Sequence, residues 1–161
     1  MAETGLSASD IAGIKVFMGS STGNMLVDEQ NTLAQLFSIT EKPILVHCED
    51  EQTIKDNLEK AKAQYGDEIP FEEHENIRSR YACIKSSIKA LELAIKYNTR
   101  LTLCHISTKE EIEMVRAAKI SNPEITAETS CNYLWFSNED YSRLGSNGQK
   151  YREALLDGRE S

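Results

Sequence analysis

Four short apolar runs along the chain predict β-strands. Each is four or five residues long, and three of them are rich in Ile, Leu or Val. Runs of this kind favour buried parallel strands over half-exposed antiparallel ones, which would alternate apolar and polar residues. The predicted strands are Ile14–Met18, Ile44–His47, Leu101–His105 and Ile125–Thr129.

Between these runs, apolar residues recur every three or four positions, which is the spacing of amphipathic helices. The stripes are Ile54, Leu58, Ala61 and Tyr65, then Ile84, Ile88, Leu91 and Ile95, then Ile112, Val115 and Ala118, with a weaker group at Leu33, Leu36 and Phe37. Ser107 and Glu110 have the spacing of a capping box, which predicts that the helix of the third stripe begins directly after the third strand.

Two polar segments interrupt this pattern. The stretch from Gln64 to Arg80 is rich in Glu and contains Pro70, so it predicts a long loop. The chain from Ser137 onwards is polar and is interrupted by several glycines. We therefore expect a single domain over residues 1–161, with poorly ordered ends at residues 1–12 and 146–161.

The order of elements is strand, helix, strand, helix, strand, helix, strand. Such alternation predicts right-handed βαβ units and a parallel sheet, that is, an α/β fold. Two architectures fit it: an open doubly wound sheet, or part of a (β/α)8 barrel. A whole barrel needs about 250 residues, so only about half of one could be present.

Composition narrows the class of protein. The 161 residues carry a net charge of −8, and no basic cluster could follow nucleic acid phosphates. No apolar run approaches the roughly 18 residues of a membrane span, and the first residues do not resemble a signal peptide, so we expect a cytoplasmic protein. The cysteines Cys48, Cys83, Cys104 and Cys131 lack the spacing of a zinc knuckle or redox motif and are expected to be reduced and mostly buried.

Three residues could carry chemistry. Lys15 lies within the first predicted strand, and His47 and His105 end the second and third. In parallel α/β folds, the C-terminal ends of the strands form the active-site face, and both imidazoles converge there if the face that carries them points inward. A charged Lys in a buried strand costs several kcal/mol unless it is paired or modified.

Alternation along each strand predicts which neighbours share a face with these residues. The predicted face carries Lys15, Phe17, Leu45, His47, Leu101, Leu103 and His105, with Cys48 and Cys104 pointing to the opposite side. A single His at a strand end is more often a hydrogen-bonded structural residue than a ligand. The residues alone therefore leave a shared functional site and a purely structural role open.

Two further groups have simpler explanations. His74 lies among glutamates in the predicted loop and is expected to be solvated. The small polar run at residues 20–23 follows the first strand, where its backbone could contact an anionic substrate or form an ordinary turn.

Several segments resemble class I dihydroorotases of the amidohydrolase superfamily, in the order in which that family has them. Gly13–Asn24 is similar to the segment that bears the family's metal-bridging lysine. Val46–Glu49 and Cys104–Thr108 are similar to two of its histidine segments. Ile77–Ser79 and Leu134–Ser137 resemble, respectively, the helix between those segments and the stretch after the seventh strand.

The resemblance implies a segment spanning strands four to seven of a (β/α)8 TIM-type barrel and a zinc-dependent cyclic amidohydrolase. Its small-molecule substrate would be dihydroorotate, or carbamoyl aspartate in the biosynthetic direction, within pyrimidine biosynthesis. Carbamylated Lys15 would bridge two zinc ions, His47 and His105 would bind the second zinc, and Asn132 would stand at a substrate-binding position.

The sequence also departs from that family. It has three histidines in all and no His-x-His pair, which in the family binds the other zinc. The base that the family places on its eighth strand is not found either, so no catalytic residue is assigned. We expect at most a partial zinc site, an inactive isolated chain, and self-association or a partner that supplies strands.

Three interpretations of the sequence remain open. The chain is an enzyme or a piece of one with dihydroorotase chemistry, a noncatalytic truncated paralogue or fragment, or an unrelated open α/β binding domain.

Overall fold

A parallel four-stranded sheet with helices on one face forms the body of the protein. The computed structural model describes residues 10–19, 30–39, 41–137 and 140. The strands are β1 (Ile14–Phe17), β2 (Ile44–His47), β3 (Leu101–Leu103) and β4 (Ile125–Ala127). The helices are α1 (Gln30–Ile39), α2 (Glu51–Tyr65), α3 (His74–Ile77), α4 (Arg80–Tyr97) and α5 (Lys109–Ser121), with short 3-10 turns η2 (Phe71–Glu73) and η3 (Cys131–Leu134).

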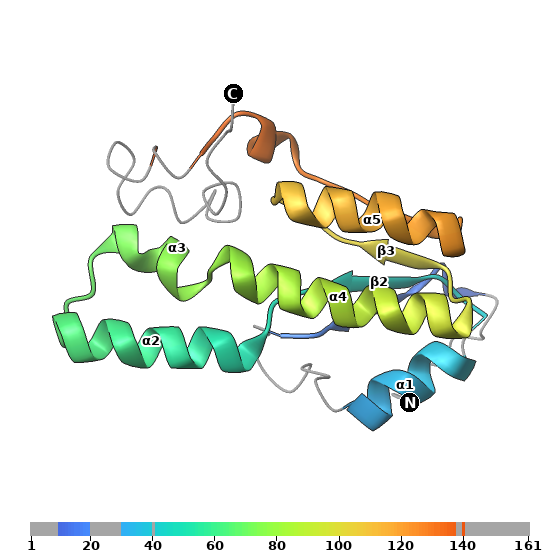
Figure 1. Cartoon of the computed structure of the whole chain (residues 1–161), viewed down its shortest axis with the longest axis horizontal. Helices are drawn as coiled ribbons and strands as arrows, with labels where there is room; N and C mark the ends of the chain where they lie inside the picture. Colours follow the sequence, from blue (N-terminus) through green and yellow to red (C-terminus); the bar gives the residue numbers. More distant parts are fainter. Residues whose placement is uncertain (1–9, 20–29, 40, 138–139, 141–161) are drawn as a thin grey trace.

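The order of the strands in the sheet is β1-β2-β3-β4, and every neighbouring pair is parallel. Helices α4 and α5 lie on the same side of the strands (Figure 1). A doubly wound sheet would instead reverse its strand order and cover both faces with helices. Consecutive order with helices on one side is the arrangement of successive βα units in a (β/α)8 barrel, which confirms the predicted fold class.

The core lies between the sheet and the helices. The register aligns Ile44, Leu101 and Ile125 in one row and Val16, Val46 and Leu103 in another. All six side chains belong to one buried cluster with residues of α1, α4 and α5. The row between them consists of Lys15, Leu45, Thr102 and Thr126, which face away from this cluster.

Two residues that were predicted to share a face with His47 and His105 lie on the other face of the sheet. Leu101 and Leu103 are each only 1% exposed and pack against the helices, not beside His105. The prediction counted alternate residues back from His105, but β3 ends at Leu103 and the φ of His105 is 43°. Alternation holds only within extended backbone, so Thr102 takes the place expected for the leucines.

The predicted loop from Gln64 to Arg80 is also partly wrong. It contains η2 and α3, and α4 begins at Arg80. The hydroxyl of Tyr65 donates to Glu73 at 2.9 Å, which ties the end of α2 to this segment. Short helical turns of this kind show no hydrophobic periodicity in the sequence, so they could not be predicted from it.

The capping box lies one residue later than predicted. Thr108 is the N-cap of α5, and its Oγ1 accepts from the backbone N–H of Glu111 at 3.2 Å.

Two buried polar residues fix the N-terminal edge of the sheet. Asn122 is fully buried, and its Nδ2 donates to the carbonyl oxygens of Ala94 and Thr99. Thr99 in turn donates its hydroxyl to the carbonyl of Phe37 at 2.8 Å. These bonds satisfy the last carbonyls of two helices and join α1, α4 and the start of β4.

The predicted poorly ordered ends lie mostly outside the described residues, as does the polar run at residues 20–23. Within the described part of the chain, no helix is long and apolar enough to cross a membrane.

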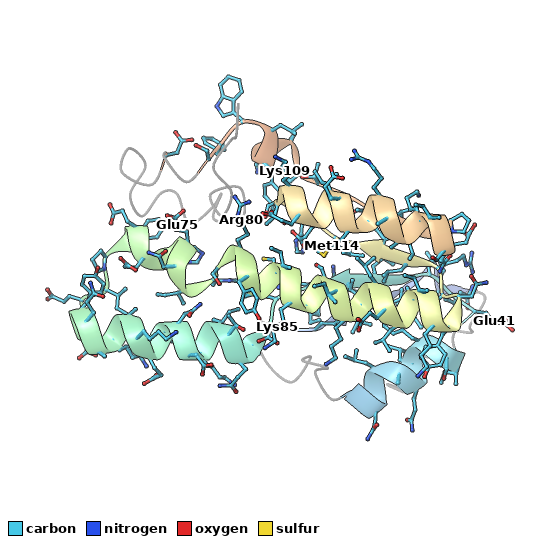
Figure 2. The ribbon with its side chains drawn as sticks, viewed as in Figure 1. Glu41, Glu75, Arg80, Lys85, Lys109 and Met114 are labelled. Carbon is cyan, nitrogen blue, oxygen red and sulfur yellow. The ribbon has the colours of Figure 1, made fainter. Side chains whose placement is uncertain are left out.

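Helix α2 begins at a carboxylate that also joins it to α4. Asp50 Oδ1 accepts from the backbone N–H of Thr53 at 2.9 Å and from Lys85 Nζ at 2.8 Å. Lys85 extends from α4 toward the start of α2 (Figure 2). Burial opposes ionisation, but the hydrogen bonds from Lys85 and Thr53 outweigh it and lower the pKa of Asp50 below its usual value.

We predict that Asp50→Ala lowers the free energy of unfolding by about 1–2 kcal/mol, because it removes the N-cap. Asp50→Asn should cost less, since an amide oxygen still caps the helix. Because the folded pKa is depressed, the charge stabilises above the ordinary pKa of 3.8, and this part is lost as the pH falls below it. Urea denaturation at neutral and acidic pH measures both effects. An advantage of the unaltered chain over Asp50→Asn that persists in acid would contradict this account.

Candidate metal centre

Two imidazoles meet at the C-terminal ends of β2 and β3. His47 is the last residue of β2 and is buried, and His105 lies two residues beyond β3. The Nδ1 of His47 is 3.0 Å from the Nε2 of His105, and the ring centroids are 4.8 Å apart. The expectation that the two histidines converge is therefore met in geometry.

The backbone of His105 makes this meeting possible. Its φ of 43° lies in the left-handed region, which non-glycine residues seldom adopt. On either side, the Cys104 N–H donates to the carbonyl of Val46 in β2, and the Ile106 N–H donates to the carbonyl of Glu128 just after β4. The turn at His105 thus occurs between two fixed points and lets its ring reach His47.

A buried carboxylate holds the other side of His47. Glu49 is 3% exposed, and its Oε2 is 2.9 Å from His47 Nε2. Its Oε1 accepts from Arg78 Nε at 2.9 Å, and Arg78 Nη2 contacts Oε2. Burial alone would raise the pKa of Glu49, but the hydrogen bonds from His47 and Arg78 and the guanidinium charge lower it to about 2.

These contacts favour one tautomer of neutral His47. An ionised carboxylate can only accept hydrogen bonds, so the proton of neutral His47 lies on Nε2. The lone pair of Nδ1 then points toward His105. A neutral imidazole with a free lone pair is the form that binds a metal ion.

Glu49 and Arg78 were assigned no role from the sequence. Glu49 follows His47 by two residues, and Arg78 lies in the segment that was predicted to be a loop. The available signal was their position inside segments that resemble dihydroorotases. Nothing in periodicity indicates that Arg78 is buried.

Just after β1, the backbone at Gly19 lies very close to the backbone of Glu49. A Cβ added at Gly19 would lie 1.5 Å from the carbonyl oxygen of Glu49. Only glycine permits this contact, so Gly19 allows the chain after β1 to lie directly against the Glu49 backbone.

Lys15 lies on the face of the sheet that the helices leave uncovered. It is exposed, and its Nζ is 5.6 Å from the centre of the Phe17 ring. The Phe17 ring is in turn 5.8 Å from that of His47. Lys15 is therefore on a strand adjacent to the histidine pair, as expected, although it is not buried.

The two cysteines next to the histidines differ from each other. Burial raises the pKa of Cys48 to about 12, and its polar neighbours Ser86, Ser87 and Glu111 belong to α4 and α5. Its predicted orientation toward the helices is confirmed. Cys104 is buried too, but Lys15 and Glu128 lie near enough to act on its pKa, so it is not confined to the layer between sheet and helices as predicted. The extended backbone ends before Cys104, which removes the alternation on which that prediction relied.

The remaining candidates lie elsewhere. Asn132 is in η3, where its carbonyl accepts from Trp135 and its Oδ1 is 4.0 Å from Cys131 Sγ. His74 begins α3 and stacks on Phe71, so it is not the solvated loop residue that was expected. Among the described residues, no group of three or more His, Cys, Asp or Glu side chains is arranged to hold a metal ion.

Comparison with known proteins relates the chain to cyclic amidohydrolases. It is 31% identical over 134 residues to a dihydroorotase of Methanosphaera stadtmanae, covering 83% of the chain and 30% of that protein. It is 31% identical over 144 residues to a dihydroorotase of Methanosarcina acetivorans, covering 84% of the chain and 30% of that protein. The chain belongs to the amidohydrolase family. No family model matches it.

Solved structures agree with this membership. A D-hydantoinase superposes with a TM-score of 0.76 at 27% identity, over 88% of the chain and 31% of that protein. The L-hydantoinase of Arthrobacter aurescens has the same fold over 83% of the chain and 30% of that protein, with a TM-score of 0.76 and 23% identity.

The amidohydrolase segment therefore spans about 30% of the length of the relatives it matches. The resemblance found in the sequence is confirmed. An unrelated open α/β domain is excluded by the sheet order and by these relatives.

Proposed function

We propose that this segment forms one half of the metal centre of a dihydroorotase-type cyclic amidohydrolase, with His47 and His105 as ligands of a single zinc ion. The proposal rests on the 3.0 Å separation of His47 Nδ1 and His105 Nε2 at adjacent strand ends. The substrate class is a small cyclic amide, dihydroorotate in pyrimidine biosynthesis, and Asn132 is proposed to stand on the substrate side.

The residues present fit a zinc ion. Two nitrogens about 2.0–2.1 Å from one tetrahedral zinc lie roughly 3.3–3.4 Å apart, so the pair would open by only a few tenths of an ångström. A ligating His usually donates its other ring N–H to a carboxylate, as His47 does to Glu49. When bound, the metal would activate water and polarise the amide carbonyl.

Lys15 is proposed as the residue that the family resemblance makes a carbamylated bridge. Its Nζ lies near Phe17 and Cys104, on the strand beside His47. A lysine carbamate is normally held by the metals that it bridges. With one histidine pair to hold metal, we expect Lys15 to be unmodified or only partly carbamylated.

The metal assignment is tested by native mass spectrometry in zinc and bicarbonate. We predict one zinc per chain and no stoichiometric gain of CO2. His105→Ala should abolish zinc binding, because one imidazole cannot hold the ion alone. His74→Gln is the matched control and should keep it. Zinc retained by His105→Ala, or a stoichiometric carbamate on Lys15, would refute this partial site.

We further predict that the 161-residue chain does not by itself open dihydroorotate. Hydrolysis needs an activated water, a polarised carbonyl and a base, and the sequence lacks the His-x-His pair that the family resemblance requires for the other metal. The assay measures ring opening as a loss of dihydroorotate absorbance. Activity that disappears in His105→Ala would show that this histidine pair suffices.

Self-association is proposed on the basis of the uncovered face and the edges of the sheet. Within the described sheet, β1 and β4 are edge strands, and edges pair with other chains unless they are blocked. Because Leu101 and Leu103 are buried against helices, the exposed row is more polar than the sequence suggested. Pairing of these edges, together with burial of Leu45 on the face between them, is the remaining driving force.

We predict that light scattering at micromolar concentration gives a dimer. Leu45→Lys should shift the mass to that of the 18.1 kDa monomer, because it places a charge in the centre of the pairing face. Ile120→Lys is the matched control, since Ile120 is 87% exposed on the outer side of α5. A monomeric unmodified chain would count against the proposal.

A further inference from the structure

We propose that Arg78 and Glu49 are positioning residues that select the protonated nitrogen and the orientation of His47 before a metal ion binds. Only the expected effect on metal affinity rests on the proposed function. The physical content of the inference concerns the metal-free chain and can be tested there.

The contacts form one continuous series across the site. The guanidinium of Arg78 engages both oxygens of Glu49, which fixes the plane of the carboxylate. That carboxylate meets His47 Nε2 at 2.9 Å, and His47 Nδ1 meets His105 Nε2 at 3.0 Å. His47, Glu49 and Arg78 are all buried, which limits competition from water for these bonds. A two-point Arg–carboxylate contact supplies direction as well as attraction.

The carboxylate removes an ambiguity that an imidazole otherwise has. Neutral histidine can carry its proton on either nitrogen, and a proton on Nδ1 would occupy the position between His47 and His105. Glu49 accepts only, so it keeps the proton on Nε2 and leaves Nδ1 as a lone pair. In the metal-free chain, His105 Nε2–H then donates to that lone pair. Binding of a metal at this position would require neutral His105 to carry its ring proton on Nδ1 instead, which frees Nε2 as a second ligand.

The segment between α2 and α4 positions Arg78 for its contact with Glu49. Arg78 follows α3 with φ −94° and ψ 64°, a non-helical conformation at the junction between α3 and α4. Its backbone N–H is bonded to the carbonyl of His74 at 2.9 Å, and Asn57 of α2 donates to the carbonyl of the preceding Ile77. These bonds direct the Arg78 side chain inward, toward a carboxylate 29 residues earlier in the chain.

The chain offers a matched pair that lacks this role. Arg80 lies at the start of α4 (Figure 2) and is paired with the partly exposed Glu110 of α5 at 2.9 Å. Glu110→Gln removes the same charge from an Arg–Glu ion pair that is partly exposed and does not contact His47. A pair that served stability alone would leave the His47 proton unmoved when it is altered.

The decisive experiment is ¹⁵N NMR of the histidine rings in the metal-free 161-residue chain, followed by titration with Co²⁺. The unaltered chain should show His47 with its proton on Nε2. Glu49→Gln should lose this preference and bind Co²⁺ about 10–100-fold more weakly. Glu110→Gln should change neither. An unchanged His47 tautomer in folded Glu49→Gln would overturn the inference.

A second variant keeps the test valid if Glu49→Gln does not fold. The double variant Glu49→Gln, Arg78→Met leaves no unpaired buried charge, so its fold should persist while the His47 preference is still lost. Unfolding of both variants, or an unchanged tautomer in the double variant, would mean a purely structural pair and would overturn the inference. Absence of Co²⁺ binding in the unaltered chain, with the tautomer responding as expected, would refute the proposed function and leave the positioning role intact.

Discussion

The in-register parallel pairing of β2 with its neighbours is the constraint on which the other features depend. Pairing of Val46 with Val16 on one side and Leu103 on the other aligns the rows of side chains that the helices cover. The same register brings the ends of β2 and β3 level. His47 then follows the last buried valine directly, and the chain after β3 has only two residues in which to bring His105 to it.

The electrostatics of the site follow from burial and from one cation. Glu49 and Glu111 are both 3% exposed and both accept hydrogen bonds. Burial raises the pKa of Glu111 in spite of its bonds from Ser87 and Thr108. Glu49 differs in having His47 and Arg78 against it, and its pKa is lowered instead. The imidazole and the guanidinium together therefore decide which of the two carboxyl groups stays charged.

The two faces of the sheet have different characters, and the site lies where they meet. On the helix side, apolar rows and buried polar caps complete a core. On the other side, the described row of Lys15, Leu45, Thr102 and Thr126 has no helix over it, and Thr102 and Thr126 bond to each other at 2.8 Å. In a (β/α)8 barrel this side faces the interior. His47 is thus buried and His105 partly buried, whereas Lys15 is exposed.

The sequence by itself determined the α/β alternation, the bounds of β2, the placement of His47 and His105 at the ends of neighbouring strands, and the family. Each depends on local patterns: continuous apolar runs, helical stripes and short motifs of the strand ends. Only the tertiary structure decided that Leu101 and Leu103 face the helices, that Cys104 lies beside Lys15 and that Arg78 is buried against Glu49. Alternation stops where the backbone leaves the strand, and a contact between residues 29 apart has no periodic trace. A buried carboxylate is costly unless a cation pairs with it. Which residue supplies that cation is decided only when the chain folds.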